Sequence, residues 1–300
     1  MLPPRTILSA VDFSDASRAS LHCAARLAAS CGAALHVVHA IDPLLAAAAR
    51  AHHIALTADT RDELDTFCRD AILPGAAAPV LHVVIGSAPD AICDTAATIG
   101  ADLIVAGSRG LSGINRLMMG TTVEHVIRRA HISVLTVPGR CPGEDVNDWG
   151  PVVAAVEDPD HPDGVVAAAA TLAGRLGAAL HLVHVVPPLG VPARWRAEAD
   201  AELQDRTDEA RRKLAAAVRR LDGVDPANVH VPNGTVADAL AAEASRHTRS
   251  LPILVMGRAE PGRGPAPGSV ASRVIARATA AVLVYLESRE PGGGALTTAS

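Results

Sequence analysis

A glycine-rich segment in the first half of the chain carries the residue types that bind phosphate. It reads GSRGLSGINRLMMGTT, in which three glycines separated by two and nine residues are followed by two threonines: Gly107, Gly110, Gly120, Thr121 and Thr122. Glycines let a backbone bend sharply and approach an anion closely. A helix opening at the third glycine would turn its unpaired N–H groups and its positive dipole end toward that anion. The segment therefore predicts a phosphate site.

The elements that must position this segment are short apolar runs alternating with helical patterns. The runs predict buried strands at Thr6–Val11, Ala34–Ala40, Val80–Ile85, Leu103–Ala106 and Val134–Val137. Helices are expected at Ser17–Ser30, Arg61–Leu73, Pro89–Ile99 and Thr121–Ala130. This alternation is typical of a parallel sheet with helices on both faces, in which ligands bind beyond the carboxyl ends of the strands.

Helix-end signals accompany these patterns. Asp15 or Ser17 is expected to cap the first helix, and Gly32 follows its last residue. Pro89 suits the first turn of its helix, with Ser87 as the expected cap.

An internal repeat organises the chain into two units. GAALHVVH at Gly32 returns as GAALHLVH at Gly177, and GTTVEHVIRRAHISVLTV at Gly120 returns as GSVASRVIARATAAVLVY at Gly268. One duplicated unit therefore covers nearly the whole chain. We expect a first domain at residues 1–140, a linker at 141–150, a second domain at 151–287 and a disordered tail at 288–300. The last strands of the two units, ISVLTV and AAVLVYL, are apolar and are expected to pair, giving a pseudo-dimer.

The second copy of the glycine-rich segment has diverged. Glu260 stands where the second glycine should be, and the interval from Gly257 to Gly268 is two residues shorter than in the first copy. Proline removes N–H donors and fixes φ, which suits an amide cradle poorly. Three prolines occupy this loop: Pro261, Pro265 and Pro267. We interpret it as a phosphate loop that has decayed.

The pattern Gly-x2-Gly-x9-Gly-Thr resembles the ATP-binding signature of the universal stress protein family. The segment AVDFSDAS, which begins at Ala10, is similar to that family's first strand with its acidic residue, Asp12, which becomes Glu157 in the second repeat. The resemblance covers both repeats, from Arg5 to Leu286. It implies an α/β fold: two tandem, doubly wound, five-stranded parallel-sheet domains of the adenine-nucleotide α-hydrolase-like class.

The resemblance also implies a nucleotide site. Gly107, Gly110, Gly120, Thr121 and Thr122 would hold the triphosphate, with Arg109 as a further phosphate contact. Asp12 would contact the nucleoside, Ala40 would line the adenine pocket, and Ala10 would be a neighbouring contact. The alternative reading stays open: the glycines would only turn a loop, and Thr121 or Asp12 would only cap a helix.

Composition narrows the classes of function. A net charge of −5 argues against nucleic acid as a partner. No apolar run is long enough for a membrane span. Five cysteines without a CxxC pair favour free thiols in the cytoplasm. The 13 histidines show no metal-site spacing, and His36, His39, His181 and His184 are expected to be packed or to have their tips in solvent rather than to catalyse.

These observations lead to one functional expectation and two rivals. The expectation is a non-enzymatic, ATP-binding module for stress response or signalling, with ATP in the first domain, Mg²⁺ as its accompanying ion, and a protein partner that the sequence does not identify. Slow metal-assisted hydrolysis is left open. One rival is an interaction protein of the same fold that binds no nucleotide. The other is an adenylyl-transfer enzyme that splits ATP, although no P-loop or general base is apparent in the sequence.

Overall fold

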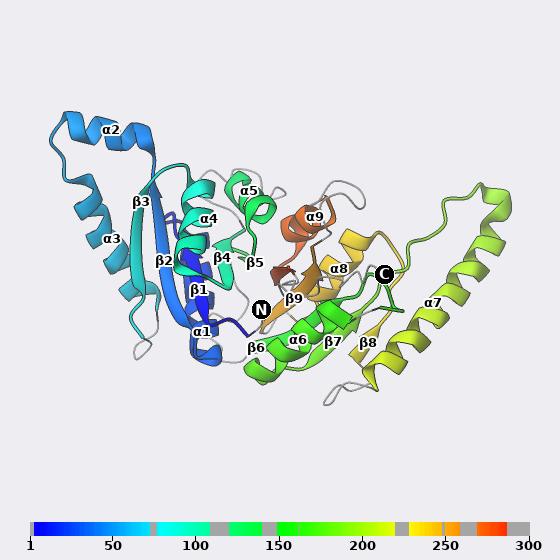
Figure 1. Cartoon of the computed structure of the whole chain (residues 1–300). Coiled ribbons are helices and arrows are strands. Elements are labelled where there is room, and N and C mark those ends of the chain that lie inside the picture. The colour runs from blue at the N-terminus through cyan, green and yellow to red at the C-terminus, as the bar shows by residue number, and fades with distance from the viewer. Residues whose placement is uncertain are drawn as a thin grey trace, which may run out of the picture.

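A single ten-stranded sheet runs through the computed structural model, in the order β3-β2-β1-β4-β5-β10-β9-β6-β7-β8 (Figure 1). The structure describes residues 3–72, 77–108, 120–139, 149–161, 163–219, 228–247, 250–258 and 269–286. Within these ranges every neighbouring pair of strands is parallel except β5 and β10. Each half of the sheet therefore has the same strand order, and the two halves meet through their last strands.

The first unit alternates strands and helices as its apolar pattern predicts. Its strands are β1 (Thr6–Ala10), β2 (Ala34–Ile41), β3 (Val80–Ile85), β4 (Leu103–Gly107) and β5 (Ser133–Val137). Its helices are α1 (Asp15–Cys31), α2 (Pro43–Ala51), α3 (Leu56–Ala71), α4 (Ala88–Ile99) and α5 (Thr121–Arg129).

The second unit repeats this plan with a longer excursion before its third strand. Its strands are β6 (Trp149–Ala155), β7 (Leu180–Val183), β8 (Val229–His230), β9 (Leu251–Gly257) and β10 (Ala281–Tyr285). Its helices are α6 (Asp163–Leu176), the 3₁₀ turn η1 (Ala193–Trp195), α7 (Arg196–Val218), α8 (Val236–Ala244) and α9 (Ser269–Arg277). β6 begins inside the segment 141–150 that the sequence predicted as a linker, and the predicted tail lies outside the described residues.

The predicted strands of the first unit agree with the observed ones to within one residue at each end. The prediction missed α2, which Asp42 caps and which carries Pro43 in its first turn. It was wrong about the cap of α1: Ser14 is the N-cap, and its Oγ accepts a hydrogen bond from the Ser17 N–H at 3.1 Å. The caps of α4 and the left-handed Gly32 at the end of α1 are as predicted.

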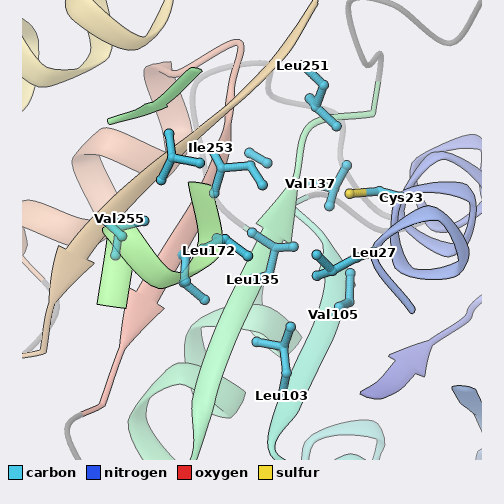
Figure 2. Packing of buried hydrophobic residues seen from close by; sticks show 14 of the residues in the cluster. Cys23, Leu27, Leu103, Val105, Leu135, Val137, Leu172, Leu251, Ile253 and Val255 are labelled. Atoms are coloured by element: carbon cyan, nitrogen blue, oxygen red, sulfur yellow. The ribbon is translucent and has the colours of Figure 1, made fainter. Parts of the chain in front are cut away.

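Two apolar cores lie on opposite faces of the sheet, and each extends through both units. Successive strand residues point to opposite faces, so Ile7 joins one core and its neighbour Leu8 joins the other. Helices α1, α3, α6 and α7 cover the first core, and α4, α5, α8 and α9 cover the second. Figure 2 shows the first core at the junction, where Leu135 and Leu172 from different units lie in one cluster. The two units thus share their cores.

The antiparallel pair β5–β10 joins the units, as the apolar last strands suggested. Leu283 lies opposite Leu135, and both side chains are buried. Side-chain hydrogen bonds support this strand pair: Thr136 Oγ1 donates to the Val282 carbonyl at 3.2 Å, and Ser133 Oγ accepts from the Leu286 N–H at 3.1 Å. The two units also meet at Trp149 of β6, because the guanidinium carbon of Arg26 in α1 lies 4.5 Å from the centroid of the Trp149 ring.

The shared cores predict that the units stay together when the chain between them is cut. A protease site introduced within residues 140–148 allows that cut. We expect the fragments to co-elute on size-exclusion chromatography at the uncut size, because separation would expose the apolar edges of β5 and β10. Leu283→Glu is the control: a carboxylate opposite Leu135 should release the fragments while circular dichroism still reports their helices. Separation of the unsubstituted fragments would contradict the shared-core account.

Candidate functional site

A pocket opens at the carboxyl ends of β1, β2 and β4, where the strand order reverses. β1 connects to β2 on one side but lies beside β4 on the other, and ligands of open parallel sheets bind at such a switch point. The cavity has a volume of about 240 Å³. Its walls come from the strand ends and from α1, α4 and α5: Ala10, Val11, Asp12, Ser17, Val38, His39, Ala40, Ala88, Ile92, Ala106, Gly107, Gly120, Thr122, Val123 and Val126.

Six of the nine sequence-predicted site residues meet in this pocket: Ala10, Asp12, Ala40, Gly107, Gly120 and Thr122. Thr121 is exposed at the start of α5 and is not among the lining residues. Arg109 and Gly110 lie outside the described residues, as does the diverged loop of the second unit. The prediction did not anticipate Ser17 of α1 or Ala88 and Ile92 of α4, although α4 directly follows the carboxyl end of β3 and so begins at this edge of the sheet.

The two ends of the glycine-rich loop lie side by side at the pocket. The Gly120 N–H donates to the Ser108 carbonyl at 3.0 Å, and the Ser108 N–H donates to the Val137 carbonyl at 2.7 Å. Gly120 is the N-cap of α5 and has no side chain with which to cap it. The first turn of α5 therefore begins at the pocket wall, next to the end of β4.

Asp12 is held in place by the start of α1. Its Oδ1 accepts hydrogen bonds from Ser14, from the N–H at 3.1 Å and from Oγ at 2.5 Å. Ser14 in turn caps α1 through the Ser17 N–H. The carboxylate thus supports the cap residue without being the cap itself, and it also lines the pocket. A substitution at Asp12 would therefore affect both the cap of α1 and the pocket wall.

Phe13 adopts a backbone conformation that bulky side chains rarely occupy, with φ of 62°. Its ring lies 4.5 Å from the ring of His39 and 5.5 Å from that of Phe67, measured between centroids. The Arg18 guanidinium covers the other aromatic partner, Phe67, at 4.3 Å. This aromatic contact holds the turn between β1 and α1, and with it Asp12, at the pocket edge.

His39 and its counterpart His184 perform the same structural task in the two units. The Nδ1 of His39 lies 2.9 Å from the Val11 carbonyl, and that of His184 lies 2.9 Å from the Val156 carbonyl. A carbonyl only accepts, so each Nδ1 carries the proton and each ring ties the second strand of its unit to the end of the first. His39 also lines the pocket.

The other two predicted histidines lie near the amino ends of their strands, away from the pocket. His36 stacks on His82 at 5.2 Å with an Nδ1···Nε2 distance of 2.9 Å, and His181 stacks on His230 at 5.5 Å. Burial, with His247 and His230 nearby, lowers the pKa of His181 to about 4. Both rings pack within the sheet, as the sequence suggested.

The second unit has larger side chains at the positions that keep the first pocket open. Ala10 pairs with Ala106 across β1 and β4, whereas the equivalent Ala155 pairs with Met256. Likewise Val185 replaces Ala40 in the repeat, and both Met256 and Val185 are buried in the core. At α9, Val270 takes the place of the Thr122 hydroxyl. In the second unit, larger apolar side chains therefore stand where the first unit has two alanines, and a valine stands where the first has a threonine hydroxyl.

Gly107 is required by packing, whatever the pocket binds. A Cβ built on it would lie 2.9 Å from both the carbonyl carbon and oxygen of Ala16 in α1, which is closer than real Cβ atoms approach. At the equivalent Gly257, the nearest atom is Cγ2 of Val165, a side-chain atom at 3.1 Å. The helix after the first strand therefore packs closest to the fourth strand in the unit that has the open pocket.

We predict that Gly107→Ala destabilises the protein more than its matched control, Gly257→Ala. The first substitution must displace helix backbone, for which overpacking costs typically about 1–3 kcal/mol, whereas the second needs only a small shift of Val165. Urea unfolding of both variants measures the difference. Equal free energies of unfolding would mean that α1 is not held against β4 as described.

None of the helices in the described part of the chain is long and apolar enough to cross a membrane. Among the same residues, no group of three or more His, Cys, Asp or Glu side chains is arranged to hold a metal ion.

Solved structures of similar fold match the chain over nearly its whole length. A protein of unknown function from Pseudomonas aeruginosa PAO1 has a TM-score of 0.66 at 18% identity, covering 94% of this chain and 92% of that one. A universal stress protein from Archaeoglobus fulgidus has a TM-score of 0.60 at 18% identity, covering 93% and 95%. At these identities the likeness shows a common two-unit fold.

The sequence itself assigns the family. A comparison with curated proteins found no match. The model of the universal stress protein family matches the chain twice, at residues 4–138 and 149–285, so that each match covers one unit of the sheet. The chain therefore belongs to the universal stress protein family, as a tandem of two such domains.

Proposed function

We propose that the first unit binds one ATP molecule in the pocket at the ends of β1, β2 and β4, and that the protein acts as a nucleotide-dependent module in a stress response. The observation that carries the proposal is the pocket itself, where small strand-end side chains, a carboxylate and the first turn of α5 converge. The cavity has a volume of about 240 Å³, and in this proposal the phosphates lie beside Gly107 and Gly120, which form part of its wall.

The backbone of Ala40 supports recognition of adenine. The Val38 carbonyl accepts from the Val11 N–H on the β1 side, and the Ile41 carbonyl accepts from the Gly86 N–H on the β3 side. Because backbone groups alternate along a strand, those of Ala40 face the β1 side, beyond the end of β1. An N–H beside a carbonyl complements adenine, which presents a ring-nitrogen acceptor beside an amino donor, whereas guanine presents a carbonyl in place of the amino group.

Asp12 supports binding of the sugar. Its carboxylate lines the pocket at the end of β1 and is fixed there by Ser14. A carboxylate accepts hydrogen bonds from hydroxyl groups such as those of a ribose, and bonds to charged acceptors are the stronger ones. In this proposal Asp12 orients the nucleoside so that its phosphates extend toward α5.

The start of α5 supports binding of the phosphates. Its first N–H groups are unpaired within the helix, and the positive dipole end favours an anion. In this proposal the Thr122 hydroxyl adds a donor, and Gly110 and Arg109 complete the cradle from the loop between β4 and α5. Mg²⁺, the ion expected with ATP, would be coordinated largely by the phosphates.

The second unit does not take part in binding in this proposal. Val185 and Met256 occupy the volume that Ala40 and Ala106 leave open in the first unit, and Val270 has no hydroxyl. The sequence of its loop, with Glu260 and three prolines, is a poor amide cradle. ATP would act by population shift: it would bind one conformer more tightly and so bias the surface that partners contact.

We predict that the chain prefers ATP to GTP by about 5- to 150-fold in affinity, because guanine leaves a buried acceptor unpaired at a cost of about 1–3 kcal/mol. Asp12→Ala should lower the affinity for ATP by about ten- to a hundredfold, which is the cost of losing a hydrogen bond to a charged group. Asp12→Asn, which keeps an oxygen for Ser14, should weaken it by about fivefold. Isothermal titration calorimetry measures all three.

Asp15→Asn is the matched control, because Asp15 is exposed in the first turn of α1 and does not line the pocket. It should leave ATP affinity unchanged. Equal affinities for ATP and GTP would contradict the role of Ala40. If Asp15→Asn weakens ATP binding as much as the Asp12 variants do, the effect of Asp12 comes from its negative charge at this edge of the sheet and not from a direct contact with the nucleoside.

A further inference from the structure

The side chain of Arg258, from the second unit, ends on a helix of the first unit. Its guanidinium donates two hydrogen bonds of 2.6 Å, from Nη1 to the Ala130 carbonyl and from Nη2 to the Arg128 carbonyl. These carbonyls belong to the last turn and the C-cap of α5. Partial burial lowers the pKa of Arg258 from its ordinary value, but a guanidinium stays charged at any physiological pH.

The position of Arg258 in the fold explains how it reaches α5. It directly follows Gly257 at the end of β9, and its N–H donates to the Tyr285 carbonyl of β10 at 2.9 Å. Because β10 pairs with β5, this edge of the second unit lies beside the first. The equivalent residue of the first unit is Ser108, whose side chain is much too short for a comparable contact. The capping arginine is therefore specific to the second repeat.

Helix α5 is short and has no side-chain cap at its start. It has only nine residues, and its N-cap, Gly120, contributes no side-chain hydrogen bond. Helices this short are marginal by themselves, so their order comes from packing and from their ends. A positive charge at the carbonyl end interacts favourably with the helix dipole and satisfies carbonyls that lack a partner within the helix. Val123, Val126 and Ile127 pack α5 against the second core, and the ion pair between Arg129 and Asp90 of α4 adds a polar contact that is about half exposed.

The opposite end of α5 forms part of the pocket wall. Gly120, Thr122, Val123 and Val126 all line the pocket. A loss of order in α5 would therefore remove the wall and misplace the N–H groups that face the phosphates. The geometry points to Arg258 as a positioning residue: the second repeat, itself without a site, orders α5 and thereby controls nucleotide affinity in the first. This inference rests on the proposed function for its effect on affinity.

The test uses the full-length chain and three variants. Arg258→Ala removes both hydrogen bonds, and Arg258→Lys keeps the charge but presents a single ammonium group. Arg277→Ala is the matched control, because Arg277 is also an arginine of the second unit but forms its ion pair with Asp238 of α8, within the second unit itself. Hydrogen exchange of the α5 amides is measured without nucleotide, and the ATP dissociation constant is measured by calorimetry.

We expect Arg258→Ala to speed exchange across α5 but not across α4, and to weaken ATP by at least about threefold, since apparent affinity falls with the fraction of binding-competent molecules. Arg258→Lys should give intermediate values, and Arg277→Ala should match the unsubstituted protein. Unchanged exchange in α5, or faster exchange without loss of affinity, would overturn the inference. An unsubstituted chain that binds no ATP would instead refute the proposed function, while the exchange data would still report whether Arg258 orders α5.

Discussion

The antiparallel pairing of β5 with β10 is the interaction on which the rest of the structure depends. It converts two five-stranded sheets into one ten-stranded sheet and lets each apolar core run through both units. It also brings Arg258 to the carbonyl end of α5. Without this pairing, each unit would expose an apolar edge strand, and α5 would lose the cap that the other unit supplies. The two repeats are therefore one structural body.

Duplication has left two units with the same frame and different interiors. The hydrogen bonds from His39 and His184 to the ends of the first strands are equivalent to the tenth of an ångström. The ligand edge differs, because alanines of the first unit become Val185 and Met256 in the second. A few buried methyl groups and one thioether thus distinguish an open pocket from a filled one. The second unit keeps its fold because packing, rather than ligand binding, holds its strands.

Much of the fold could be predicted from the sequence, because buried parallel strands are short continuous apolar runs. The glycine spacing and Asp12 located the pocket, since both follow strands whose carboxyl ends meet at one edge. The helix α2 was missed because PLLAAAARA is only nine residues long and consists almost entirely of alanine and leucine, so that it does not stand out from the apolar strand before it. The packing role of Gly107 and the reach of Arg258 depend on contacts between distant segments, which local patterns do not encode.

Native mass spectrometry of the full-length chain with excess ATP tests the central claim most directly, because it counts bound nucleotide. The account predicts one ATP per chain, and none after Ala40→Val with Ala106→Met, which gives the first pocket the side chains of the second. Both substitutions add side-chain volume and remove no polar group. The charge-state distribution in the same spectrum shows whether the double variant is still folded. Two ATP molecules per chain, or one that survives the double substitution, would contradict the assignment of the site to the first unit.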